Sequence, residues 1–191
     1  MFLFLDTETT GLPKKWSDNP KEWPRIIQLA WRLHDTSGKL LFKASSLIKP
    51  DGWVVPNEKF WIDAGLTQER NEKEGVAIDL VLNEFIYLRK QYKYLVGHNI
   101  NFDRKILRGE IMRLGNTDEF TNEYLCTMMK GTKHCAIPQV GRGGLKWPTL
   151  SELHMKLFGT EAQEMHDAGN DLEITAKCFF EMLRLGIITL N

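Results

Sequence analysis

The sequence predicts a mixed α/β domain in which an antiparallel meander of strands is followed by strands that alternate with helices. Apolar runs separated by turn signals occupy the chain up to Ile48. After residue 75, apolar residues recur at helical spacing, with short extended segments between the helices. This order of elements is typical of a sheet that is covered by helices.

The first three strands are expected to form the antiparallel meander. They are the apolar segments 1–6, 26–33 and 39–48. The first strand ends at Asp6, so a buried strand reaches the surface at an acidic end. Asp35-Thr36-Ser37-Gly38 joins the second strand to the third as a hairpin turn. Residues 9–13 have the composition of a turn, and residues 14–24 that of a polar loop.

The rest of the chain is expected to alternate between helices and short strands. Helices are predicted at 76–92, 101–114, 149–158 and 167–185, short strands at 94–97 and 124–129, and a long loop at 130–148. Asn101 is expected to cap the second of these helices, and Gly115 to end it. Thr149 or Ser151 is expected to cap the third helix, which then stops at Gly159.

Length and composition limit the class of protein. A chain of 191 residues favours one domain, residues 1–191. Three cysteines at irregular spacing indicate no disulfide framework, which favours a reducing, cytoplasmic location. The N-terminus lacks the basic segment of a signal peptide, and no apolar run is long enough for a membrane span. With 25 basic and 25 acidic residues, contact with a polyanion must be local or metal-mediated.

Acidic residues stand at three places where an apolar run ends or a helix begins. Asp6 and Glu8 are two residues apart on an extended segment, so both point to one face with about 6.6 Å between their Cα atoms. Asp103 lies in the first turn of one predicted helix, and Asp171 lies one turn into the last. Taken singly, these acids would be a solvated strand end or helix caps. Taken together they would repel one another, so a shared site implies a bound cation.

A histidine accompanies the last of these acids. His166 lies directly before the last predicted helix, so the start of this helix presents a metal ligand and a base together. Asp167 is expected to be a cap or a first-turn acid rather than a ligand. A lone histidine is more often structural, but the neighbouring acids favour a functional one.

At this point the residues resemble the three motifs of the DEDD exonucleases. These motifs are Asp6-x-Glu8, His98-Asn99-x-x-Phe102-Asp103 and His166-x-x-x-x-Asp171. The histidine five residues before the last aspartate is typical of the DEDDh (DnaQ-like) branch, which includes the proofreading (epsilon) subunits of bacterial DNA polymerase III and stand-alone relatives. Residues 25–29 and 148–153 also resemble this family, so the likeness spans nearly the whole chain.

The resemblance implies a ribonuclease-H-like fold, with a five-stranded mixed sheet flanked by helices. It also implies two Mg²⁺ or Mn²⁺ ions held by Asp6, Glu8, Asp103 and Asp171. One ion would activate water with His166 as the general base, and the other would stabilise the leaving 3′ oxygen. The expected activity is 3′-5′ exonucleolytic release of nucleoside 5′-monophosphates.

The same resemblance implies contacts with single-stranded or frayed nucleic acid 3′ ends. The expected substrate-binding residues are Thr9, Thr10, Gly11, Leu12, His98, Asn99 and Phe102. Leu12 is expected either to wedge against the terminal bases or to pack within its loop. Phe102 is expected to pack either on the terminal sugar or in the start of its helix, and His98 and Asn99 could equally be ordinary loop residues.

Two loops and one cluster leave further alternatives open. Trp16, Trp23 and the lysines of residues 14–21 could stack on and pair with single-stranded nucleic acid, but a solvated loop anchored by tryptophan is favoured. The basic residues of 130–147 could contact phosphates or simply be soluble surface. The spacing of Cys126, His134 and Cys135 fits no ordinary zinc site.

The leading hypothesis is therefore a metal-dependent exonuclease that acts on DNA. An exoribonuclease or oligoribonuclease of the same family is the alternative, because no residue reveals how the 2′-hydroxyl is read. A catalytically silent nucleic-acid-binding module is disfavoured, because every ligand position and the histidine are filled. The chain is expected to have no additional C-terminal segment for association with a polymerase.

Overall fold

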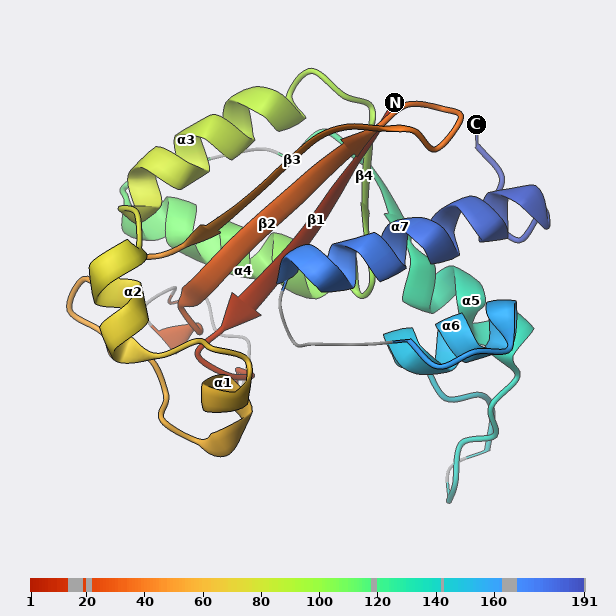
Figure 1. Cartoon of the computed structure of the whole chain (residues 1–191). Helices are drawn as coiled ribbons and strands as arrows, with labels where there is room; N and C mark the ends of the chain where they lie inside the picture. Colours follow the sequence, from red (N-terminus) through yellow and green to blue (C-terminus); the bar gives the residue numbers. More distant parts are fainter. Residues whose placement is uncertain (14–18, 20–21, 118–119, 142, 163–167, 191) are drawn as a thin grey trace.

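A five-stranded mixed sheet with the order β3-β2-β1-β4-β5 forms the middle of the molecule (Figure 1). Its strands are β1 (Phe2–Thr9), β2 (Ile26–His34), β3 (Leu40–Leu47), β4 (Tyr94–Gly97) and β5 (Glu123–Cys126). β1, β2 and β3 are antiparallel, as predicted, whereas β4 pairs parallel to β1 and β5 parallel to β4. The computed structural model describes residues 1–13, 19, 22–117, 120–141, 143–162 and 168–190.

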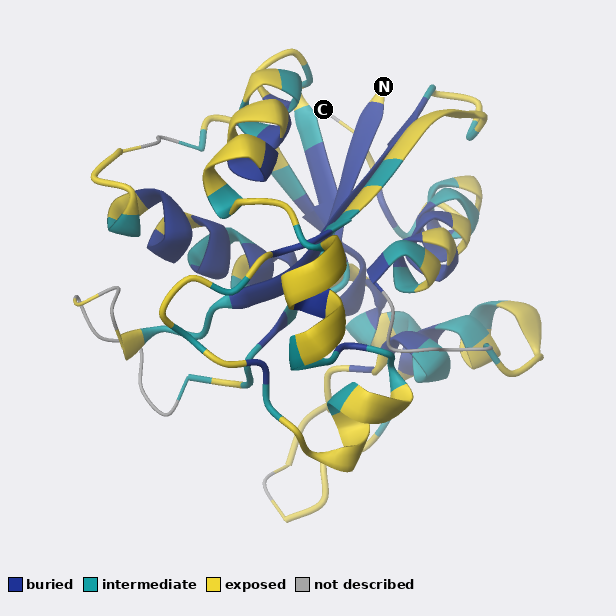
Figure 2. Ribbon diagram, turned by 60° about the vertical axis from the view of Figure 1, so that its left-hand side comes forward, coloured by how far each residue is buried: buried dark blue, intermediate teal, exposed yellow. Residues whose placement is uncertain are grey.

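Helices cover both faces of this sheet (Figure 1). They are α1 (Lys59–Asp63), α2 (Gln68–Glu74), α3 (Ile78–Arg89), α4 (Ile100–Arg113), α5 (Thr127–Cys135), α6 (Leu150–Phe158) and α7 (Ala168–Arg184). Figure 2 shows that the central strands are buried, while the helices are exposed on their outer sides. Among the described residues, no helix is both long enough and apolar enough to cross a membrane.

The side chains of β1 alternate between the two buried faces. Leu3 and Leu5 pack in the core cluster that includes residues of α3 and α4. Phe2 and Phe4 point the other way, into the cluster that includes residues of α7. Because side chains in a strand alternate with period two, Asp6 and Glu8 continue the series that faces α7, and Thr7 continues the opposite series. The pattern of burial in one strand thus decides where its acids emerge.

Several predicted elements are confirmed with small changes in their bounds. β1 runs past Asp6 to Thr9, with a register irregularity between Glu8 and Thr9. The helices predicted at 76–92, 149–158 and 167–185 correspond to α3, α6 and α7. Thr149 is the cap of α6, and it forms a capping box with Glu152. Gly159 ends α6 with φ of +70°, as expected for a left-handed C-terminal residue.

Other predictions were wrong. The cap of α4 is Asn99, in the left-handed conformation with φ of 67°, and not Asn101, which lies inside the helix. The chain after β5 enters α5 at Thr127, so the strand predicted to Met129 and the loop predicted from residue 130 both misplace this helix. Gly131 falls within the loop predicted at 130–148, yet a Cβ there would lie 2.8 Å from Leu153 Cδ1. The glycine therefore permits close packing of α5 against α6.

Candidate active site

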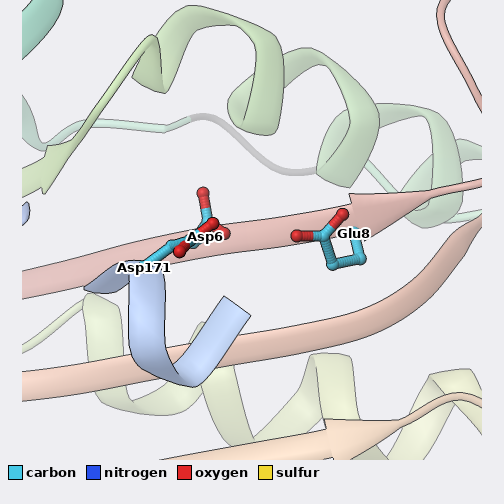
Figure 3. Close-up of side chains that lie close together, drawn as sticks. All are labelled: Asp6, Glu8 and Asp171. Carbon is cyan, nitrogen blue, oxygen red and sulfur yellow. The ribbon is translucent and has the colours of Figure 1, made fainter. Parts of the chain in front are cut away.

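Three carboxylates come together at the end of β1. One ligand oxygen each from Asp6, Glu8 and Asp171 lies within 4.8 Å of the others. Figure 3 shows Asp6 and Glu8 on β1 and Asp171 on the adjacent α7. Such a cluster of oxygen ligands suits a hard divalent cation, because the ligands would otherwise repel one another.

Asp103 approaches Asp6 from the opposite face of the sheet. It lies in the first turn of α4 and is 3% exposed. Its Oδ1 accepts hydrogen bonds from Thr7 N–H at 3.1 Å and from Thr7 Oγ1 at 2.8 Å. Thr7 points towards this face because it lies between Asp6 and Glu8 in the alternation of β1. The sequence offered no signal for this role of Thr7 apart from its position between the two acids.

Burial and neighbouring charge disfavour the ionisation of Asp6, and burial disfavours that of Asp103. The pKa of Asp6 is raised well above its usual value, mainly by burial and then by the charges of Asp103, Glu8 and Asp171. Burial also raises the pKa of Asp103 to about 7, and the hydrogen bonds from Thr7 only partly oppose this shift. Asp6 and Asp103 are therefore electrostatic neighbours, and a bound cation would relieve the unfavourable charge of the group.

Gln28 connects the strand that lies beside Glu8 to the start of α7. In the register of β1 and β2, Gln28 is the partner of Glu8. Its Oε1 accepts a hydrogen bond from the N–H of Ala168, the first residue of α7, at 3.1 Å, and its Nε2 donates to Ser45 Oγ at 3.1 Å. Gln28 thereby fixes the helix that carries Asp171. Residues 25–29 resemble the family in sequence, but nothing in that resemblance predicts this role of Gln28.

The turn after β1 is held by Trp61 and by Arg25, which is in turn held by Glu110. Trp61 of α1 donates from Nε1 to the carbonyl oxygen of Thr9 at 3.0 Å. The N–H of Arg25 donates to Thr10 Oγ1, and the N–H of Thr10 donates to Arg25 O, both at 2.9 Å. Arg25 Nε lies 2.9 Å from Glu110 Oε1 of α4, and Glu110 is 1% exposed. Sequence reasoning missed Trp61 because α1 has no helical pattern long enough to predict it.

The tip of this turn leaves Leu12 exposed. Its side chain is 81% exposed, so Leu12 does not pack within its own loop. Gly11 lies next to it with φ of +132°, a conformation that glycine adopts without strain. Thr9 Oγ1 donates to the carbonyl oxygen of Gly11 at 2.8 Å, which fixes the bend.

His98, Asn99 and Phe102 form the approach to α4. Nδ1 of His98 lies 3.0 Å from Thr127 Oγ1, and Nε2 lies 3.1 Å from the carbonyl oxygen of Pro148. Because a carbonyl oxygen can only accept, Nε2 carries a proton. Phe102 is half-buried and packs against the core cluster beside α4. These contacts support the structural interpretation of His98, whereas substrate contact by all three residues stays a prediction.

Some predicted residues lie outside the part of the chain that the structure describes. His166 and Asp167 fall within 163–167, and Trp16 and the lysines at 14, 15 and 21 fall within 14–18 and 20–21. Trp23 is described, and it contacts α4, since a Cβ on Gly109 would lie 2.7 Å from the Trp23 ring. This contact supports the anchored loop predicted for Trp23. Cys126 and Cys135 are buried free thiols.

Comparison with protein families gives one match across most of the chain. The RNase T family, described as Exonuclease, matches residues 3–179. A curated relative is the 3′-5′ exonuclease DinG of Bacillus subtilis (strain 168), which is 26% identical over 188 residues. That match covers 95% of this chain and 17% of the relative.

Solved structures of exonuclease I share the fold. E. coli exonuclease I in complex with a dA16 oligonucleotide has a TM-score of 0.71 at 20% identity, over 96% of this chain and 40% of that chain. Exonuclease I from Methylocaldum szegediense has a TM-score of 0.66 at 18% identity, over 96% of this chain and 40% of that chain. The predicted ribonuclease-H-like fold is therefore confirmed, and this chain spans less than half the length of these relatives.

Proposed function

Because this chain belongs to the RNase T exonuclease family, we propose that it is a metal-dependent 3′-5′ exonuclease that releases nucleoside 5′-monophosphates from DNA. The observation that carries this proposal is the group of Asp6, Glu8 and Asp171, whose ligand oxygens lie within 4.8 Å of one another. The family consists of exonucleases, and the cluster of carboxylates suits divalent cations. Both observations point to metal-dependent hydrolysis of phosphodiesters.

The proposed cofactors are two Mg²⁺ or Mn²⁺ ions. All candidate ligands are carboxylate oxygens, which hard divalent cations prefer. The ions would be held by Asp6, Glu8, Asp103 and Asp171. Asp103 would bind through its other carboxylate oxygen, Oδ2, or would give up its hydrogen bonds from Thr7. Bound ions would polarise the scissile phosphate and lower the pKa of the attacking water. The raised pKa of Asp6 supports this assignment, because it reflects negative charge that a cation would offset.

The remaining residues would position the substrate and move a proton. His166 would take the proton of the attacking water, since an unperturbed imidazole titrates near pH ~6.5. Thr9, Thr10 and Gly11 would receive the terminal nucleotide at the turn that Trp61 and Arg25 hold. The exposure of Leu12 supports a wedge between terminal bases. Phe102 would pack on the terminal sugar from the start of α4.

DNA is the favoured substrate. Structures of exonuclease I with the same fold hold dA16 and dT13 oligonucleotides. The exonuclease unit would comprise residues 1–191, and its three cysteines, free thiols in the structure, would suit a reducing, cytoplasmic location. Single-stranded or frayed 3′ ends are the proposed partners, and association with a polymerase forms no part of the proposal.

The decisive experiment combines labelled oligomers with an Asp6→Ala variant. DNA and RNA strands labelled at either end are incubated with Mg²⁺ or with chelator. The wild-type protein should shorten DNA from its 3′ end only with Mg²⁺, and Asp6→Ala should reduce the rate by at least roughly a hundredfold. The variant should stay folded, because removing one partly buried acid relieves repulsion within the cluster.

Glu84→Ala is the matched control, since Glu84 is an exposed acid on α3, away from the cluster. It should retain wild-type activity. Cleavage from the 5′ end, or full activity in chelator, would contradict the proposal. Faster degradation of RNA than of DNA would favour the alternative exoribonuclease.

A further inference from the structure

A polar groove of about 570 Å³ opens beside the carboxylate cluster. Its floor is formed by β2 and β3, and its walls by α2 and the first turn of α7. Three cationic side chains line it: Arg32, Lys43 and Arg70. Gln28, Asn170 and Glu173 lie on the side nearest to α7. Apart from Gln28, which fixes the start of α7, none of these residues has a role in the proposed cleavage step.

The groove and the carboxylate cluster share one face of the sheet. Gln28 pairs with Glu8 across β1 and β2, and Arg32 pairs with Lys43 across β2 and β3. Residues that pair directly point to the same face, and neighbouring strands lie about 4.8 Å apart. The floor of the groove therefore begins about one β-strand away from Glu8. A nucleic-acid strand whose 3′ end is held at the cluster can reach the groove across the first turn of α7.

Arg32 gives the groove a buried cation with unused hydrogen-bonding capacity. The residue is 8% exposed, and its Nη1 lies 3.2 Å from Glu173 Oε2. Its buried Nε has no hydrogen-bond partner among the residues that the structure describes. A buried guanidinium with an unmatched donor is costly unless a ligand supplies an acceptor. Glu173 is shared with Lys177, at 3.0 Å, and so binds Arg32 only in part.

We propose that this groove binds a backbone phosphate of the nucleic-acid strand whose 3′ end lies at the carboxylate cluster. The proposal rests on the proposed function. Exposed Lys43 supplies positive charge at the rim, and Arg32 supplies a directed donor at the floor. Arg70, also at the rim, is paired with Glu74 of the same lining at 3.0 Å, so it adds a donor for phosphate rather than net charge. Phosphate oxygens are strong acceptors for guanidinium groups. In a chain of zero net charge, a groove with three cations and two acids is a local excess of positive charge, which a polyanion would require.

The test compares two double variants with the same change in charge. Lys43→Gln with Arg70→Gln removes the rim cations, whereas Lys39→Gln with Lys73→Gln removes exposed lysines that do not line the groove. Binding of labelled dT13 is measured in Ca²⁺ over a range of salt, with thermal unfolding as the check on folding. The groove variant should bind roughly tenfold more weakly, as expected for losing charge-assisted contacts. Its salt dependence should become shallower by about 0.7 for each lost phosphate contact.

A third variant should change affinity in the opposite direction. Glu173→Gln removes the carboxylate that competes with phosphate for Arg32, so dT13 should bind more tightly. Unchanged dT13 binding by the groove variant, or equal weakening by both double variants, would overturn the proposal, as would weaker binding by Glu173→Gln.

Hydrolysis of thymidine 5′-monophosphate p-nitrophenyl ester separates this inference from the nuclease activity itself. The ester is too short to reach the groove, so groove variants should cleave it at the wild-type rate. Wild-type protein inactive on both ester and oligomers would instead refute the proposed function.

Discussion

At the scale of single residues, the role of His166 as general base can be tested separately from the metal-binding role of the acids. His166→Ala should lower the rate of cleavage at neutral pH by roughly 10²- to 10⁴-fold, the usual contribution of a general base. Affinity for Mn²⁺ should stay within a few-fold of wild type, because the proposed ligands are all carboxylates. The pH–rate profile should lose the inflection that the imidazole contributes. His154→Ala is the control, since His154 lies on α6, where its Nδ1 is 3.0 Å from the carbonyl oxygen of Thr160. An unaltered profile in His166→Ala would remove the base role.

The residues that could be found from sequence are those whose chemistry is unusual for their position. Asp6, Glu8 and Asp171 interrupt apolar patterns, and the structure brings them together. Thr7 and Gln28 carry no such signal, because a threonine or a glutamine in a strand has many ordinary roles. Their importance follows from partners 96 and 140 residues away in the chain, Asp103 and Ala168 respectively. A single sequence without coordinates does not reveal those partners.

At the scale of elements, the start of α7 depends on Gln28. Gln28→Leu should leave the N–H of Ala168 without its acceptor and let the first turn of α7 shift, carrying Asp171 with it. We expect Mn²⁺ affinity, measured by calorimetry, to fall by about tenfold, as for other residues that orient metal ligands. Unfolding should cost about 1–2 kcal/mol less than in wild type. Gln28→Glu keeps the acceptor and should restore much of the lost affinity. Loss of stability without any change in Mn²⁺ affinity would reduce Gln28 to a structural residue.

Elements with long apolar periodicity were predictable, and those set by packing were not. α3 and α7 present apolar stripes, and their helices are confirmed. α2 is a polar helix, held by the Arg70–Glu74 ion pair and by Asn71, which donates to carbonyl oxygens of Ile27 and Ile48. α5 contains Gly131, although glycine has a low helix propensity. The close approach of Leu153 explains the glycine, because there is no room for a Cβ at this position. In both helices tertiary contacts override the local sequence signal.

At the scale of the whole molecule, the topology places several carboxyl groups close together where β1, α4 and α7 meet. Asp6 and Asp103 have raised pKa values in the fold, about 7 for Asp103, whereas unfolded carboxyls titrate near pH ~4. Between these values the folded protein binds more protons than the unfolded chain. The free energy of unfolding in chelator should therefore fall as pH rises from about 4 to about 7, by at least about 1.4 kcal/mol.

Divalent cations should reverse this loss of stability. Mg²⁺ binds the ionised acids of the native state, so its stabilising effect should grow as pH rises through about 7. Urea unfolding with Mg²⁺ and with chelator, from pH about 5 to about 8, measures both effects.

His34 contributes a pH dependence of the opposite sign. Burial lowers the pKa of His34, so its contribution makes the free energy of unfolding rise with pH near that group's usual value, against the fall caused by the acids. The comparison with Asp6→Asn separates the two contributions, because that variant keeps His34 and removes the most strongly opposed carboxylate. In Asp6→Asn the pH slope in chelator should be smaller and the stabilisation by Mg²⁺ should be lost. Wild-type curves that coincide with and without Mg²⁺ at pH about 8 would show that the meeting point of β1, α4 and α7 is not a cation site.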